Sequence, residues 1–182
     1  MTKVDLRRKL RGLARYSAEV AAEKSRKICE RIVAMPAWEC ARTVAVYAAN
    51  AHEPDPRMLW EYRGERVFAY PRVHGTEAEN ERLVFYRVDA IEELQLSRWG
   101  LHEPPINPMR EVDPMTVDLV IVPGVGFTKE GERLVRGRGH YDRFLQSLRS
   151  GVAKVGICFE SHVLPAIPVE SHDARMDDVI FE

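Results

Sequence analysis

The chain has 182 residues, of which 45% are hydrophobic, so it is about the size of one compact domain and can bury a sizeable core. Its 27 basic and 28 acidic residues leave a formal net charge of −1. That balance excludes a general electrostatic attraction to nucleic acid or to an anionic membrane, and we expect neither as a partner. The longest apolar run, around residues 119–127, is much shorter than the roughly 20 residues of a membrane-spanning helix.

The N-terminus and the cysteines both indicate a reducing compartment. Charged residues stand at the N-terminus where a signal peptide would need an apolar stretch, so we expect a cytoplasmic protein. Cys29, Cys40 and Cys158 are odd in number, widely spaced and without a CxxC pair, which favours reduced, buried thiols over a disulfide framework or a zinc site. Nothing in the sequence specifies an oligomeric state.

The first part of the chain has the pattern of amphipathic helices. Between residues 4 and 34 the apolar residues recur three and four positions apart. Ser17 is a good N-cap and is followed by Glu19, so we expect it to divide this region into two helices, the second of which ends at Pro36. We therefore predict that residues 1–35 form a helical segment packed on a single domain spanning residues 1–182.

The remaining chain alternates between predicted strands and predicted helices. The predicted strands are short β-branched or apolar runs at residues 43–48, 66–70, 83–86, 119–122, 154–159 and 179–181. Pro71 and Pro123 should end two of them. Helices are predicted at residues 57–62 and 141–148, and residues 100–114 read as a long loop. This alternation predicts a layered α/β domain with a largely parallel sheet.

Polar residues follow several of the predicted strands. Glu53 and Asp55 come after the first strand, Arg72 comes after the second, and residues 124–142 follow the strand at 119–122. In open α/β sheets ligands bind beyond the carboxyl ends of the strands, so these are the candidate ligand positions.

Residues 131–143 combine arginines and glycines directly before a predicted helix. Glycines let the backbone approach an anion, a helix N-terminus attracts it, and guanidinium groups bind it in a bidentate manner, so this segment suits a phosphate group. It matches neither the Walker A pattern nor GxGxxG. Taken alone, the segment is equally compatible with a solvated turn that carries charged tips.

Three further features each leave two interpretations open. Asp142 could bind the Mg²⁺ that a nucleoside triphosphate brings, or it could be only an acidic residue in the first turn of a helix. Trp99 could cover a flat heterocycle, or it could pack in a small satellite core. The histidines and acids at residues 160–173 fit no transition-metal ligand spacing, so we do not expect such a site.

Several motifs occur together in a specific order along almost the whole chain. They are Lys3-x-x-Leu6-Arg7, Glu53-x-Asp55, Tyr70-Pro71-Arg72, Trp99 ahead of Glu103-Pro104, residues 122–127, residues 133–142, and Pro168-x-x-x-His172-Asp173 with Asp178 and Glu182. In this order and spacing the chain resembles the 5-formyltetrahydrofolate cyclo-ligase family, also called methenyltetrahydrofolate synthetase. The resemblance implies a three-layer α/β/α fold. It also implies the ATP-dependent cyclisation of 5-formyltetrahydrofolate to 5,10-methenyltetrahydrofolate, with release of ADP and phosphate.

The resemblance further implies roles for particular residues, with ATP and Mg²⁺ as cofactors and a folate as the small-molecule partner. The implied ATP-binding residues are Lys3, Arg7, Arg133, Leu134, Val135, Arg136, Gly137, Arg138, Gly139, His140 and Tyr141. Arg136 and Arg138 would contact the phosphates and, with Tyr141, form the catalytic set. Asp142 and Asp173 would hold Mg²⁺. Glu53 would accept hydrogen bonds from the pterin, and Trp99 and Tyr141 would line the folate pocket.

The sequence departs from the family pattern at four positions. Val135 stands where the family usually has Gly, His140 where it has Tyr, Pro56 where it has Thr, and His162 where it has Gln. Because these positions lie close to implied ligand residues, two alternatives remain. One is a diverged paralogue that binds nucleotide or folate without turnover, and the other is an ATP-dependent ligase or kinase with a different acceptor.

Overall fold

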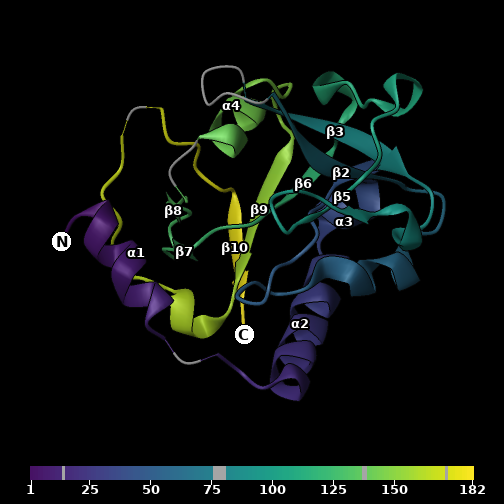
Figure 1. Cartoon of the computed structure of the whole chain (residues 1–182). Helices are drawn as coiled ribbons and strands as arrows, with labels where there is room; N and C mark the ends of the chain where they lie inside the picture. The colour runs from purple at the N-terminus through teal and green to yellow at the C-terminus, as the bar shows by residue number, and fades with distance from the viewer. Residues whose placement is uncertain (14, 76–80, 137–138, 171) are drawn as a thin grey trace.

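Six strands form one central sheet in the order β10-β9-β6-β1-β2-β3 in the computed structural model, which describes residues 1–13, 15–75, 81–136, 139–170 and 172–182 (Figure 1). These strands are β1 (Thr43–Ala45), β2 (Val67–His74), β3 (Arg82–Val88), β6 (Leu119–Val122), β9 (Ala153–Cys158) and β10 (Asp178–Phe181). All neighbouring strands run parallel except β2 and β3. The predicted α/β class with a largely parallel sheet is therefore confirmed.

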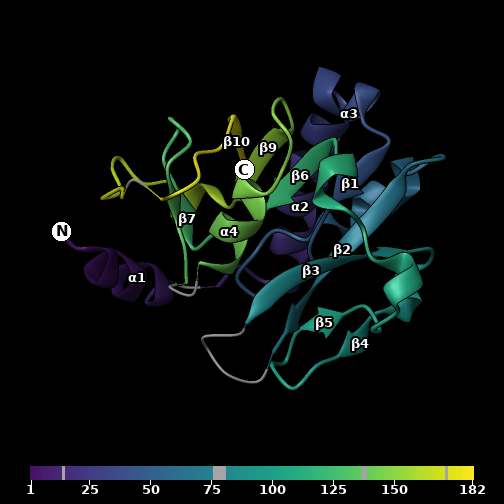
Figure 2. The same cartoon turned by 90° about the horizontal axis from the view of Figure 1, so that it is seen from above.

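Helices cover both faces of the sheet, as Figure 2 shows. One face carries α2 (Ala18–Val33), α3 (Pro36–Cys40) and the 3₁₀ helix η1 (Pro56–Tyr62), and the other carries α4 (His140–Gln146). Alternate side chains of β6 supply the two cores, because Leu119 and Ile121 pack with the α2 side while Val120 and Val122 pack with the α4 side. The three-layer α/β/α architecture is thus confirmed.

The helix α1 (Lys3–Arg11) packs beside the loops and not on the sheet. Thr2 and Asp5 form a capping box at its start. Leu6 and Leu10 are buried in a cluster with Leu134, at the edge of the layered domain. Ser17 caps α2, as predicted, while Pro36 occupies the first turn of α3.

The remaining elements are short and belong to the connections. They are the 3₁₀ helices η2 (Ile91–Glu93), η3 (Pro108–Arg110), η4 (Pro114–Thr116) and η5 (Glu160–His162), and the strand pairs β4 (Gln95–Leu96) with β5 (His102–Glu103) and β7 (Gly126–Phe127) with β8 (Arg133–Leu134). The 95–103 pair lies below β2 and β3 in Figure 2. None of the described helices has the length and apolar character to cross a membrane. Cys29 and Cys158 are buried, but Cys40 is exposed, so the prediction of buried thiols is wrong for that residue.

The sequence predicts that β2 ends before Pro71, and this prediction is wrong, since the strand continues to His74. The parallel strand β1 pairs with β2 only as far as Ala69, so beyond that residue β1 no longer lies along this edge of β2. The backbone N–H of Val73 faces this edge and donates to Glu103 at 3.2 Å. Because alternate residues of a strand direct their N–H groups to the same side, the proline nitrogen also faces this edge and interrupts no ladder hydrogen bond.

The Phe127 ring is fully buried between two glycines that have no room for a side chain. A Cβ atom at Gly156 would come 2.5 Å from one ring carbon, and a Cβ atom at Gly124 would come 2.6 Å from another. Because interiors are packed at near-crystalline density, this ring fixes the distance between β9 and the turn after β6.

We predict that Gly156→Ala lowers the free energy of unfolding by about 1–3 kcal/mol, because an added methyl group in a filled core forces the ring to move. The measurement is a urea titration followed by circular dichroism. Gly12→Ala is the matched control, since Gly12 has φ −81° and its nearest Cβ contact would be 3.4 Å, so it should change stability little. Equal effects of the two substitutions would contradict the packing argument.

Candidate active site

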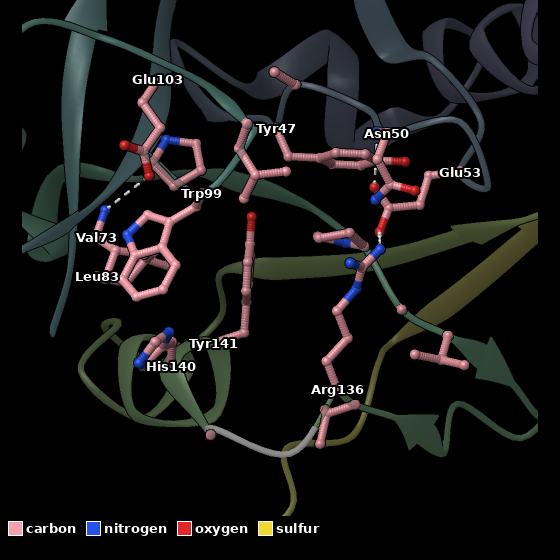
Figure 3. Close-up of a pocket in the computed structure, with 18 of the residues that line it drawn as sticks. Tyr47, Asn50, Glu53, Val73, Leu83, Trp99, Glu103, Arg136, His140 and Tyr141 are labelled. Carbon is pink, nitrogen blue, oxygen red and sulfur yellow. Dashed lines mark hydrogen bonds and ion pairs between the residues drawn. The ribbon is translucent and has the colours of Figure 1, made fainter. Parts of the chain in front are cut away.

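A cavity of about 380 Å³ opens beyond the carboxyl ends of β1 and β6 (Figure 3). From β1 the sheet continues through β2 to β3, and from β6 it continues in the opposite direction through β9 to β10. The connections after β1 and β6 therefore diverge and leave a crevice, which is where open α/β sheets bind ligands. Tyr47 and Ala48 line it from the β1 side, and Pro123 and Gly124 line it from the β6 side.

The arginine- and glycine-rich segment forms one wall of this cavity. The residues of it that line the cavity are Arg133, Val135, Arg136, Gly139, His140, Tyr141 and Asp142. Leu134 does not, because its side chain is buried against α1. Gly137 and Arg138 lie outside the described residues. Gly139 begins α4 with φ +62°, a conformation that favours glycine and turns the chain sharply into the helix.

A buried ion pair holds this wall to α4. Arg133 Nη2 lies 2.6 Å from Asp142 Oδ1, and the two side chains are only 3% and 6% exposed. The same carboxylate oxygen accepts a hydrogen bond from the backbone N–H of Ala174 at 3.4 Å. Asp142 is thus more than an acidic residue in a helix first turn, because it joins β8, α4 and the segment before β10.

Tyr141 presents an unpaired hydroxyl to the cavity. Its Oη and the Nε of Arg133 are buried and have no hydrogen-bond partner among the described residues. Burial raises the pKa of Tyr141, and the Glu53 carboxylate raises it further, while the Arg133 guanidinium opposes the shift only in part. The phenol therefore keeps its proton, and it is a hydrogen-bond donor without an acceptor, which is a sign of a ligand position.

Glu53 lies on the opposite side of the cavity from Trp99, and it is paired with the arginine-rich wall (Figure 3). Its Oε1 is 3.0 Å from Arg136 Nη2, and its Oε2 accepts from the backbone N–H of Asn50 at 3.2 Å. The hydroxyl of Tyr47 donates to the Pro54 carbonyl at 2.6 Å and so holds this turn in place. Both oxygens of Glu53 are therefore engaged.

Two of the polar residues that follow strands have structural roles. Asp55 accepts from the backbone N–H of Arg57 at 3.0 Å as the cap of η1, so it does not face the cavity. Arg72 donates to the Pro104 carbonyl at 2.7 Å and supports the loop that carries Glu103. Trp99 lines the cavity and is 41% exposed, with the Arg98 guanidinium 4.7 Å from its ring centroid.

Lys3, Arg7 and Asp173 lie next to this wall but do not line the cavity. Arg7 Nε donates to the Val135 carbonyl at 2.7 Å. Lys3 Nζ is 2.7 Å from Asp173 Oδ2. Burial raises the pKa of Asp173, but the hydrogen bonds from Lys3 and from the Glu170 backbone, together with the Lys3 charge, outweigh it and the net shift is downward, so this acid is ionised at neutral pH. The residues that the resemblance assigns to the nucleotide and the metal thus form two groups. One group lines the cavity, and the other, which consists of Lys3, Arg7 and Asp173, lies next to the cavity wall.

Among the described residues no group of three or more His, Cys, Asp or Glu side chains could hold a metal ion. Mg²⁺ bound with a nucleotide needs fewer protein ligands, usually one or two carboxylates beside the phosphate oxygens. Asp142 fits that requirement, because it lines the cavity and its hydrogen bonds with the described residues involve only Oδ1, so that Oδ2 has no partner among those residues.

The four departures from the family pattern are not equally placed. Val135 and His140 line the cavity, and His140 Nε2 is 3.1 Å from Glu81 Oε2. Pro56 begins η1 and is buried. His162 lies in η5 and does not line the cavity, and burial followed by the charge of His52 lowers its pKa.

Sequence reasoning assigned no role to several residues that line the cavity. They include Tyr47, Asn50, Val73, Leu83 and Glu103. Val73 belongs to the part of β2 beyond Pro71, which the sequence did not predict as strand, whereas Leu83 lies in the predicted strand at residues 83–86 and only its position in the cavity was not foreseen. Glu103 is part of a recognised motif, but its loop carries no periodicity that shows which side chains face inward.

Comparison with known proteins identifies the family. The whole chain, residues 1–182, matches the sequence model of the 5-formyltetrahydrofolate cyclo-ligase family. The chain belongs to this family. The expectation of an enzyme of the ligase class is therefore confirmed.

Individual relatives of the 5-formyltetrahydrofolate cyclo-ligase family cover nearly the full chain. The 5-formyltetrahydrofolate cyclo-ligase of Mus musculus is 26% identical over 191 residues, which cover 99% of this chain and 91% of the relative. That of Escherichia coli K12 is 32% identical over 167 residues, covering 89% and 90%. The solved structure of 5,10-methenyltetrahydrofolate synthetase from Aquifex aeolicus superposes with a TM-score of 0.83 at 30% identity, covering 100% of this chain and 90% of that one.

We predict that Asp142→Asn lowers the free energy of unfolding by about 3 kcal/mol or more, because it leaves the Arg133 charge buried without a counter-charge. Urea denaturation measures this. Glu23→Gln is the matched control, since it removes an exposed ion pair with Arg26 and should leave the midpoint nearly unchanged. A loss at Asp142 no larger than at Glu23 would show that the pair does not hold the wall.

Proposed function

We propose that the chain catalyses the ATP- and Mg²⁺-dependent cyclisation of 5-formyltetrahydrofolate to 5,10-methenyltetrahydrofolate, with release of ADP and phosphate. The observation that carries this proposal is the cavity itself. It joins the arginine- and glycine-rich wall to an end lined by the Trp99 indole, and the buried Tyr141 hydroxyl, which has no partner among the described residues, lies between them. A single cavity with both kinds of lining suits a reaction between a phosphate donor and a flat heterocycle.

The chemistry needs positioning more than a protein nucleophile. A formamide oxygen is a poor leaving group, and ATP with Mg²⁺ supplies the phosphoryl group that converts it into a good one. The neighbouring folate nitrogen can then bond to the formyl carbon, with its proton released to solvent and the C–O bond broken as phosphate departs. The protein's part is to hold the reacting atoms in line and to neutralise charge.

The nucleotide side of the site is built from residues 133–141 and α1. Arg136 is largely exposed, so its guanidinium is available to the phosphates, and we assign Arg138 to the same role. Arg7 holds the Val135 carbonyl and thereby fixes the start of the turn. Lys3 is within reach of the same phosphates if Asp173 contributes to the metal site, because the two side chains are in contact.

We assign Asp142 and Asp173 to Mg²⁺. Asp142 has one oxygen left for the ion, and Asp173 directly precedes Ala174, whose N–H donates to Asp142. Each carboxylate is already held by a cation, Arg133 or Lys3, so both are oriented before the metal arrives. The ion would neutralise phosphate charge next to the cavity.

The folate side contains Glu53, Trp99 and Tyr141. Trp99 offers an indole face for the pterin, and Glu53 offers carboxylate oxygens to its N–H groups. The protonated Tyr141 hydroxyl can donate to the formyl or phosphate oxygen, where negative charge develops during transfer. A neutral donor in a water-poor cavity supports that charge more strongly than water would.

Turnover is tested directly by mixing the protein with 5-formyltetrahydrofolate, ATP and Mg²⁺. We expect methenyltetrahydrofolate, detected by its near-ultraviolet absorbance, to form together with an equal amount of ADP, and no product without ATP. Thermal stabilisation by Mg·ATP without product would indicate the diverged binding paralogue instead. ADP formation only with another acceptor would indicate a different ligase or kinase.

We predict that Arg136→Ala raises the KM for ATP by about tenfold or more, since a charged hydrogen bond contributes about 1.5–3 kcal/mol and 1.4 kcal/mol corresponds to tenfold. The fold should be unaffected because Arg136 is exposed. Arg57→Ala is the control, as Arg57 is also exposed and paired with a carboxylate, Asp55, but lies outside the cavity. An unchanged KM for Arg136→Ala would remove this residue from the nucleotide site.

A further inference from the structure

Three carboxylates line the cavity, and one of them has no cationic partner. Glu53 is paired with Arg136 and Asp142 is paired with Arg133. Glu103 forms no ion pair with any residue that the structure describes, although it is only 4% exposed. Burying an ionised carboxylate without a cation is costly unless hydrogen-bond donors compensate.

The protein supplies only part of that compensation. Oε1 of Glu103 accepts from the backbone N–H of Val73 at 3.2 Å, and Oε2 accepts no hydrogen bond from the described part of the chain. The residue is nevertheless held firmly, because it pairs with Gln95 in the β4–β5 ladder and Arg72 binds the carbonyl of the following Pro104. A rigid, buried acceptor with spare capacity is a binding position for a ligand that carries donors.

Glu103 lies at the opposite end of the cavity from Arg136. Figure 3 shows it beside Trp99 at one end, with Glu53 and Arg136 at the other and Tyr141 between them. In the proposed reaction the phosphates lie against Arg136, so the formyl group on N5 of the pterin must point that way. N5 and the 2-amino group are at opposite ends of the fused ring. The 2-amino and N3–H edge must then face away from Arg136, toward Glu103.

We propose that Glu103 binds the pterin of the folate substrate by accepting hydrogen bonds from its N3–H and 2-amino groups. The proposal rests on the proposed function, which it deepens by orienting the substrate. Two parallel donors on a planar edge match a carboxylate in the way that a guanidinium does. Trp99, at the same end, can cover the ring face. The oxygens of Glu53 already accept hydrogen bonds from Arg136 and Asn50, and this residue would accept from the remaining N–H of the pterin ring.

The test compares 5-formyltetrahydrofolate with its analogue in which a methyl group replaces the 2-amino group. Turnover (kcat/KM) and affinity by calorimetry are measured for each compound with wild type, Glu103→Gln, Glu53→Gln and Glu92→Gln. Glu92 is an exposed glutamate outside the cavity and serves as the control. A glutamine at 103 retains an oxygen for the Val73 N–H, and its thermal midpoint verifies folding.

We expect wild type, Glu92→Gln and Glu53→Gln to prefer the natural compound by roughly 100-fold or more, because a site built for a donor group rejects a ligand that lacks it. Glu103→Gln should reduce this preference to within about tenfold, with the KM for ATP unchanged. If wild type shows no preference, or if the preference survives in Glu103→Gln and disappears in Glu53→Gln, the orientation is wrong.

The same experiment distinguishes a failure of this inference from a failure of the proposed function. If wild type binds both compounds but forms no product, the proposed reaction fails, while the ratio of dissociation constants in wild type and Glu103→Gln still decides this inference. If wild type binds neither compound, both proposals are overturned. If Glu103→Gln does not fold, the wild-type preference and its persistence in Glu53→Gln decide the assignment.

Discussion

The buried ion pair between Arg133 and Asp142 is the constraint on which the rest of the site depends. It joins β8 to the first turn of α4 with both side chains almost fully removed from water. Neither charge could remain there alone, since an unpaired buried charge costs several kcal/mol. The pair therefore fixes where α4 begins, and with it the direction of Tyr141 and of the turn that enters the helix. A surface ion pair of the same length would impose no such restriction.

Around that pair, segments from distant parts of the sequence meet at one cavity. The first helix reaches the wall through Arg7 and its buried leucines, the turn after β1 contributes Glu53, and the antiparallel extension of β2 and β3 contributes Val73 and Leu83. The sheet topology explains the meeting point, because the connections leave β1 and β6 in opposite directions. Family membership supports the proposed reaction, and the geometry of this cavity supports the proposal that the reaction takes place here.

The sequence predicts the parts of the fold that follow local rules. The strand at residues 119–122 is a fully buried apolar run ended by Pro123, so both its position and its length are correct. The continuation of β2 through Pro71 depends on where the neighbouring strand stops, which is a tertiary property. For the same reason, a motif can indicate that residues 133–142 matter, but it cannot show that Asp142 is paired with Arg133. Nor can it show that Glu103 lines the cavity without a cationic partner among the described residues, because both depend on which loops fold against each other.

In the proposed reaction one cavity holds the nucleotide and the folate, with the formyl group between Arg136 and Tyr141. The decisive measurement is a crystal structure of the protein with a non-hydrolysable ATP analogue, Mg²⁺ and 5-formyltetrahydrofolate. We expect phosphate density against residues 133–141 and a pterin beside Trp99, with its formyl oxygen near the Tyr141 hydroxyl. Phosphates or pterin bound outside this cavity, or a formyl group facing away from the phosphates, would contradict this arrangement.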